Sequence, residues 1–220
     1  MSLIKKENNV KYSQLNEEEF GLHQYSSYEE YKKLQNEMNL TKIKKGVGCW
    51  ESEKSFFQLS KAIKASIDGE IRFGICHGTR RGQEQALFSK FLDTCVIGTE
   101  IADTANEYPL TIQWDFHDIK EEWLGSIDFI YSNSLDHSYD PIFCLSQWSK
   151  CITGDGLIIL AHGDKGHGSL EYKDKYDPFI GSHETYEKII SQSDLRIVEK
   201  TRKYSTNDGT THFILRRQGE

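Results

Sequence analysis

The residues with the clearest chemical meaning in this sequence surround a glycine-bearing turn at residues 77–82, which reads HGTRRG. An apolar run from Ile71 to Cys76 precedes the turn, and a helix-like segment follows from Gln83. Glycine lets the backbone approach a ligand closely, and a helix N-terminus presents N–H groups that have no partner inside the helix. The turn is a candidate nucleotide-binding edge. An ordinary strand-to-helix connection can have the same glycine spacing, so the residues after the turn must distinguish it from a nucleotide-binding edge.

Acidic residues end the next two apolar runs. Glu100 closes the run that begins at Cys95, 18 residues after Gly82. A carboxylate there can accept hydrogen bonds from two adjacent ribose hydroxyl groups, and the alternative is a helix cap or a solvated acid. Asp115 and Phe116 close the third run, where the carboxylate can bind the exocyclic amine of adenine and the ring can flank the base. The alternative for this pair is a helix cap followed by a core aromatic residue.

Acid–base candidates follow the fourth and fifth runs. His137 is a candidate general base that Asp136 or Asp140 can orient, although a structural or substrate-contact role for His137 is equally open. Asp140 also fits the N-cap of a helix, because a proline follows it. His162 is the second catalytic candidate and begins a Gly/His-rich stretch at residues 162–168, which we expect to be a substrate loop. The spacing of its His and Asp residues matches no metal template, so no metal site is predicted.

The elements that must position these residues alternate along the chain. Apolar strand-like runs alternate with helix-like segments, which predicts a mainly parallel sheet covered by helices on both faces. Ligands bind such sheets beyond the carboxyl ends of the strands, where the polar residues above gather. The predicted strands span residues 71–76, 95–99, 110–114, 127–132 and 157–161, and the predicted helices span residues 51–67, 83–92, 142–151 and 184–191.

The two ends of the chain depart from this alternation. Residues 195–204 and 212–216 are strand-like and flank the hairpin sequence TNDG, so the last strand is expected to be antiparallel to its neighbour. Residues 1–46 are polar and predict an N-terminal helical appendage or lid, and residues 47–220 form the predicted α/β domain. Aromatic side chains recur at helical spacing around Tyr28 and Tyr31, either to dock the appendage or to close it over a pocket.

The composition of this 220-residue chain disfavours some classes of binding partner. The formal net charge is −7, which disfavours nonspecific binding to nucleic acid. No segment approaches the ~20 apolar residues of a membrane span, and the N-terminus lacks the apolar core of a signal peptide, so a cytoplasmic protein without a membrane partner is predicted. The five cysteines include no C-x-x-C pair and are predicted to be buried free thiols.

Taken together, residues 50–217 resemble the class I S-adenosylmethionine-dependent methyltransferases. The resemblance rests on residues 77–84 as the first motif, Glu100 as the acid after the second strand, and residues 115–116 at the adenine motif. Residues 128–133 (DFIYSN) match the fourth motif, and residues 154–160 (GDGLIIL) match the turn into the fifth strand. It implies a three-layer, doubly wound α/β fold with a mostly parallel seven-stranded sheet whose last strand is antiparallel, the Rossmann-like methyltransferase fold.

The resemblance also implies S-adenosylmethionine as the cofactor and names the residues expected around it. The first motif of the family usually reads acid-x-Gly-x-Gly-x-Gly, whereas Cys76 stands here at the acid and Arg80 at the middle glycine. Arg80 can pair with the cofactor carboxylate or with Glu84, or it can obstruct the pocket. The expected cofactor-binding residues are His77, Gly78, Thr79, Arg80, Gly82, Glu84, Glu100, Ile101, Asp115, Phe116, Ser132 and Asn133.

The predicted function is in-line methyl transfer to a small-molecule or soluble metabolite acceptor. Catalysis of this kind rests mainly on positioning, and a general base such as His137 is needed only when the acceptor is a hydroxyl or a protonated amine. The Asn/Asp-Pro-Pro-Tyr/Phe sequence that amino-methylating members often carry after the fourth strand is absent, which disfavours nucleic acid as a substrate. The alternatives are a methyltransferase-fold protein that binds the cofactor without turnover, and another nucleotide-cofactor enzyme such as a small dehydrogenase.

Overall fold

The computed structural model describes residues 20–163, 176–206 and 209–219. Most of the predicted substrate loop (residues 164–168) and part of the predicted hairpin turn (residues 207–208) lie outside these described residues. None of the helices in the described segments is long and apolar enough to cross a membrane.

A seven-stranded sheet forms the centre of the molecule, with the strand order β4-β3-β2-β5-β6-β9-β8. All neighbours pair in parallel except β9, which is antiparallel to both β6 and β8. This arrangement confirms the fold predicted from the sequence, including the reversed last strand. The strands are β2 Phe73–His77, β3 Cys95–Glu100, β4 Thr111–Gln113, β5 Ile127–Ser132, β6 Ile152–Gly163, β8 Leu195–Thr201 and β9 Thr210–Arg217.

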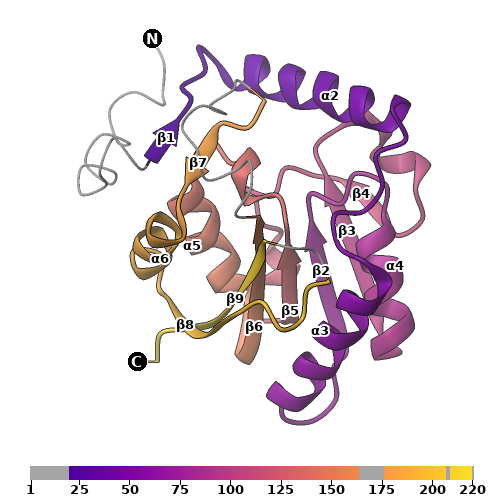
Figure 1. Cartoon of the computed structure of the whole chain (residues 1–220), viewed down its shortest axis with the longest axis vertical. Coiled ribbons are helices and arrows are strands. Elements are labelled where there is room, and N and C mark those ends of the chain that lie inside the picture. Colours follow the sequence, from indigo (N-terminus) through magenta and orange to yellow (C-terminus); the bar gives the residue numbers. More distant parts are fainter. Residues whose placement is uncertain (1–19, 164–175, 207–208, 220) are drawn as a thin grey trace.

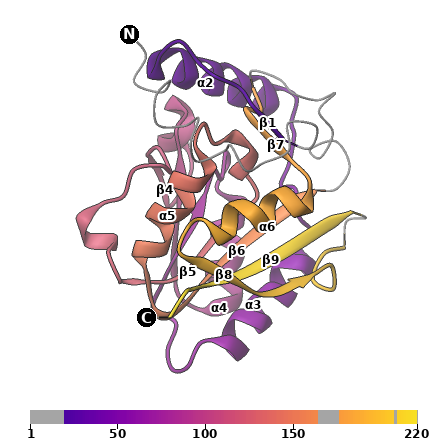
Figure 2. The ribbon, with the colours of Figure 1, turned by 90° about the vertical axis from the view of Figure 1, so that its left-hand side faces the viewer.

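Helices cover both faces of the sheet, which makes the molecule three-layered (Figure 1, Figure 2). One core cluster joins Phe56 and Phe88, from α3 and α4, to Phe129 of β5. A second cluster on the other face joins Trp148 of α5 and Ile189 of α6 to the sheet. The helices are α3 Glu53–Ser66, α4 Gln83–Leu92, α5 Pro141–Cys151 and α6 His183–Ser191, and the short 3-10 turns are η1 Asp103–Glu107, η2 Glu121–Trp123 and η3 Leu135–His137.

The strand order reverses beside β2, and this reversal places the ligand edge. The chain moves outward from β2 through β3 to β4, then returns to pair β5 with the opposite edge of β2. Open α/β sheets bind ligands in the crevice at such a switch point, beyond the carboxyl ends of the strands. The turn at residues 77–82 leaves β2 at this point.

The N-terminal segment lies against this edge. Helix α2 (Tyr28–Lys44) crosses the carboxyl ends of the strands in both views (Figure 1, Figure 2). Strand β1 (Phe20–Leu22) pairs antiparallel with β7 (Phe179–Gly181) in a separate two-stranded sheet that the sequence pattern did not predict. The helical character of residues 28–44 agrees with prediction, whereas the proposed boundary at residue 46 stays a prediction.

The cysteines are free thiols, as expected from the sequence. The expectation that they are buried is wrong for Cys95, which is exposed as the first residue of β3. Cys76, Cys144 and Cys151 are buried, and Cys49 is intermediate.

Candidate functional site

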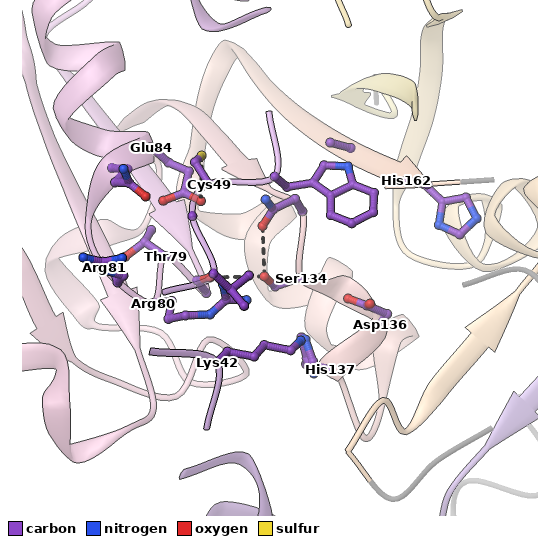
Figure 3. Close-up of a pocket in the computed structure, with 18 of the residues that line it drawn as sticks. Lys42, Cys49, Thr79, Arg80, Arg81, Glu84, Ser134, Asp136, His137 and His162 are labelled. Atoms are coloured by element: carbon purple, nitrogen blue, oxygen red, sulfur yellow. Dashed lines mark hydrogen bonds between the residues drawn. The ribbon is translucent and has the colours of Figure 1, made fainter. Parts of the chain in front are cut away.

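A pocket of about 310 Å³, here called the main pocket, opens beside the turn at residues 77–82 (Figure 3). One end is lined by Thr79, Arg80, Arg81, Glu84 and Cys49, and we call it the Glu84 end. The opposite end, the His137 end, is lined by Asp136, His137, His162 and Tyr186. The main pocket therefore separates the glycine turn from the histidine candidates.

A smaller cavity of about 40 Å³, here called the side cavity, lies under α2. Glu100, Ile101 and Phe116 line it from the sheet, and Tyr31 and Gln35 line it from α2. Gly78 and Arg80 border both spaces, so the turn connects the side cavity to the main pocket.

The backbone of the turn explains how the first motif tolerates Arg80. Gly78, Arg80 and Gly82 have φ angles of +74°, +45° and +72°, all in the left-handed region that favours glycine. Arg80 thus keeps a positive φ at the position where the family usually has its middle glycine. Gly78 could not be replaced by a larger residue in the same way, because a Cβ atom built on it would lie 2.5 Å from Cβ of Ser134.

Glu100 lies at the end of β3, as predicted, with 6% of its surface exposed. The Arg80 N–H donates to its Oε2 at 2.9 Å, and the Ala102 N–H donates to its Oε1 at 3.1 Å. The carboxylate is therefore held rigidly at the rim of the side cavity by two backbone donors. A carboxylate oxygen has more than one lone pair, so further donors can still approach it.

Asp115 is joined to α2 and to His117. The hydroxyl of Tyr28 donates to Asp115 Oδ2 at 3.0 Å, and His117 places its backbone N and Nδ1 at 2.9 and 2.6 Å from Oδ1. Burial alone would raise the pKa of Asp115, but the charge and hydrogen bonds of His117 outweigh it and hold this pKa below its usual value. Phe116 lines the side cavity, and its carbonyl accepts a hydrogen bond from Trp148 at 2.7 Å.

His137 is oriented by a partner that the sequence did not reveal. Its Nδ1 lies 3.0 Å from the carbonyl of Tyr176 and 3.4 Å from Oδ1 of Asp177. A carbonyl only accepts, so Nδ1 carries the proton and Nε2 of the neutral ring keeps the lone pair. Asp140 instead accepts from the Phe143 N–H at 3.0 Å and caps α5, which agrees with the alternative reading of that residue.

The residues around His137 include one group whose ligand atoms could bind a cation together. The ligand atoms of Asp136, His137 and Asp177 lie within 4.8 Å of one another, and no other such group occurs among the described residues. The absence of a metal stays a prediction.

The remaining predicted residues divide between the pocket and the core. His162 is buried at the His137 end, with its ring centre 4.1 Å from that of Tyr186. Asn133 lines the main pocket, whereas the hydroxyl of Ser132 donates to the carbonyl of His77 and so ties β5 to β2. Lys42, Cys49, Trp50 and Tyr186 also line the main pocket and were not predicted, because no local pattern marks them.

The side chain of His77 points into the core and away from both spaces. Its ring stacks on Trp148 at 4.6 Å, and its Nδ1 lies 2.7 Å from the hydroxyl of Thr99. Burial, reinforced by the nearby His117, lowers the pKa of His77 to about 3. Contact between His77 and a cofactor would therefore have to come from its backbone.

This buried neutral histidine makes stability pH-dependent. The folded-state pKa lies below the ordinary value of 6.5, so below pH 6.5 protons bind the unfolded chain more readily. The free energy of unfolding is expected to fall by about 2 kcal/mol through His77 between pH 7 and pH 5. In urea unfolding of His77→Phe, the free energy of unfolding should fall between pH 7 and pH 5 by about 2 kcal/mol less than in the unmodified protein. An equal fall in both proteins would contradict a lowered pKa of His77.

The fold and the site together define a class. A parallel sheet with a reversed last strand, a glycine turn after its first strand and an acid at the end of the next strand form the class I methyltransferase fold, so the resemblance seen in the sequence is confirmed at the level of the fold. No protein-family model matches the sequence, and no curated protein does.

Solved structures agree with this class. The 1,6-didemethyltoxoflavin N1-methyltransferase of Burkholderia thailandensis, solved with its acceptor and S-adenosylhomocysteine, is similar with a TM-score of 0.68 at 14% identity, over 90% of this chain and 93% of that one. An S-adenosylmethionine-dependent methyltransferase of Clostridium acetobutylicum has a TM-score of 0.57 at 11% identity, over 83% and 98%. Geranyl diphosphate C-methyltransferase of Streptomyces coelicolor, solved with Mg²⁺, geranyl diphosphate and S-adenosylhomocysteine, has a TM-score of 0.56 at 11% identity, over 73% and 78%.

Proposed function

We propose that this protein is an S-adenosylmethionine-dependent methyltransferase that acts on a small-molecule acceptor. The observation that carries the proposal is the placement of Glu100 at the end of β3, where it lines the side cavity beside the left-handed turn at residues 77–82. Two of the fold neighbours named above, those from Burkholderia thailandensis and Streptomyces coelicolor, are methyltransferases of small molecules, which supports the acceptor class. The proposed compartment is the cytoplasm.

The residues present fit this cofactor in their chemistry. Glu100 can accept bonds from the ribose hydroxyls, and Ile101 and Phe116 offer apolar surfaces for the base. Gly78 provides a cradle that a Cβ atom would fill. Arg80 or Arg81, at the Glu84 end, can take the cofactor carboxylate, since neither forms an ion pair among the described residues. The side cavity is small, so α2 must shift before an adenosyl group can enter.

The chemistry divides between the cofactor and the chain. S-adenosylmethionine supplies a methyl group on a positively charged sulfur. The main pocket positions the acceptor beyond the turn, between Trp50, His162 and His137. His137 takes the acceptor proton at Nε2 while the Tyr176 carbonyl holds its Nδ1 proton. Tyr31 of α2 donates to the His137 carbonyl at 3.1 Å, so α2 is tied to the segment that carries this base.

Calorimetric titration tests the proposal. Both S-adenosylmethionine and S-adenosylhomocysteine are expected to bind, and acceptors with an ionisable oxygen or nitrogen should release S-adenosylhomocysteine from S-adenosylmethionine. Binding of the cofactor without methyl transfer to any member of a broad acceptor panel would favour a binding protein without turnover. Binding of NAD in place of both sulfur ligands would point to the dehydrogenase alternative.

We further propose that α2 is a lid whose closed position competes with the nucleoside. The hydroxyl of Tyr28 donates to Oδ2 of Asp115, and the Asp115 carboxylate is the group that the sequence assigns to the adenine amine. Tyr28→Phe removes a hydrogen bond worth about 1 kcal/mol from the closed position, so apparent affinity for S-adenosylhomocysteine should rise about fivefold.

The matched control is Tyr108→Phe, because none of the described residues hydrogen-bonds to the Tyr108 hydroxyl. Its affinity should equal that of the unmodified protein. An unchanged or lower affinity in Tyr28→Phe would remove the proposed competition between α2 and the nucleoside.

A further inference from the structure

Glu84 is a buried acid that faces the main pocket from the first turn of α4. Only 6% of its surface is exposed, and its Oε1 lies 3.4 Å from the thiol of Cys49. Figure 3 shows the two side chains together at the Glu84 end, away from His137 and His162. Among the described residues, no lysine, arginine or histidine lies within ion-pair distance of it.

Packing alone does not explain a carboxyl group in this place. Burying an acid without a cationic partner is costly, and the Glu84 carboxyl group has only its own backbone N–H and the Cys49 thiol as hydrogen-bond donors among the described residues. The N-cap of α4 is Gly82, which makes no side-chain cap bond, so Glu84 is not part of a reciprocal cap. The Glu84 carboxyl group is thus directed into a pocket whose other charged residues at this end are arginines.

The groups around Glu84 place it beside the position of the missing motif acid. Glu84 acts electrostatically on the buried thiol of Cys76 in β2, raising its pKa together with burial, and on Tyr131 in β5. Arg80 from the turn and Glu100 from β3 act on Glu84 in turn, and Cys49 faces it from the segment before α3. The carboxyl group that the sequence lacks at Cys76 is therefore present nearby, on α4.

We propose that Glu84 binds the α-ammonium group of the cofactor's amino-acid part, in place of the acid that the first motif lacks at Cys76. Arg80 or Arg81 then binds the α-carboxylate of the same zwitterion at the same end of the pocket. The ligand class is an α-amino acid joined through sulfur to adenosine. This inference rests on the proposed function and assigns the anionic partner that the cysteine cannot supply.

Protonation gives the proposal a signature that is independent of turnover. Burial raises the pKa of Glu84 to about 7, so near pH 7 about half of the unliganded protein carries a protonated Glu84. An ammonium group favours the ionised form, and binding should therefore release protons to the buffer. Affinity should rise with pH, on the order of tenfold between pH 6 and pH 8.

The experiment compares two ligands in calorimetric titrations of the full chain. S-adenosylhomocysteine carries the α-ammonium group, and 5′-methylthioadenosine lacks the amino-acid part. Glu84→Gln should weaken S-adenosylhomocysteine binding about 10- to 100-fold, abolish proton release and leave 5′-methylthioadenosine binding unchanged. Glu53→Gln, an exposed acid of α3, is the matched control and should alter neither ligand.

Restoring an acid at the motif position completes the test. Cys76→Asp in the Glu84→Gln background should recover at least part of the lost affinity for S-adenosylhomocysteine, because the Cys76 thiol lies within electrostatic reach of Glu84. If the double variant does not fold, the inference is still tested by Glu84→Gln alone, whose affinity for S-adenosylhomocysteine should no longer rise between pH 6 and pH 8. Equal loss of both ligands in Glu84→Gln, or unchanged proton release, would overturn the inference. Failure of the unmodified protein to bind either ligand would instead overturn the proposed function.

Discussion

Glu100→Gln is expected to weaken S-adenosylhomocysteine binding on the order of 10- to 100-fold, which corresponds to about 1–3 kcal/mol for hydrogen bonds to a charged group. The carboxylate stands at the end of β3, and the Arg80 and Ala102 N–H groups hold it in place. The variant keeps the size of the side chain but loses its charge and half of its acceptor capacity. Isothermal titration calorimetry measures the change directly.

The fold must be kept while the site is altered, so a control acid from the same region is needed. Glu107 is exposed at the end of η1 and touches neither the main pocket nor the side cavity. Glu107→Gln should bind S-adenosylhomocysteine as the unmodified protein does. Equal affinities for Glu100→Gln and Glu107→Gln would mean that the ribose lies elsewhere.

Gly78→Ala is expected to damage stability and binding together. The residue has a φ of +74°, and its new methyl group would lie 2.5 Å from Cβ of Ser134, whose backbone belongs to the opposite wall of the turn. A left-handed alanine and an overpacked contact together should reduce the free energy of unfolding by about 1–4 kcal/mol. Urea denaturation measures this loss, and calorimetry should show weaker binding because the turn is displaced.

A second glycine offers the matched control. Gly154 lies in β6, and a Cβ atom built on it meets nothing within 4 Å. Gly154→Ala should therefore change the free energy of unfolding by only a few tenths of a kcal/mol. If Gly78→Ala were as stable as Gly154→Ala and bound equally well, the turn would not have the rigid geometry described above.

Much of the central sheet was predictable because its signals are local. The bounds predicted for helix 83–92 and strand 127–132 agree with α4 and β5. Apolar periodicity, a glycine at the helix start and short buried runs all lie within a few residues of the element they define. The same reasoning placed Glu100 at the end of β3, because the apolar run that begins at Cys95 stops at this acid.

The contacts around α2 were not predictable in the same way. Tyr28 and Asp115 are 87 residues apart, and the pairing of β1 with β7 joins segments more than 150 residues apart. Asp177 approaches His137 across a separation of 40 residues, so the sequence favoured the adjacent acids Asp136 and Asp140 instead. Such partners depend on tertiary packing, and no local spacing encodes them.

The two departures from the family's first motif have different structural consequences. Arg80 keeps the left-handed backbone of the glycine it replaces, so its guanidinium can face the pocket without altering the turn. Cys76 removes a charge, and Glu84 lies close enough to supply one. The sequence identified both positions as departures, but only the placement of Glu84 relates one to the other.

The most direct test of the account is a crystal structure of the protein with S-adenosylhomocysteine. We expect the ribose hydroxyls on the carboxylate of Glu100, the base between Ile101 and Phe116, and the amino-acid part between Glu84 and the arginines of the turn. Helix α2 should be displaced from its contact with Asp115. Crystals grown at millimolar ligand with no nucleoside at the end of β3, or with the ligand bound elsewhere, would contradict the proposed function.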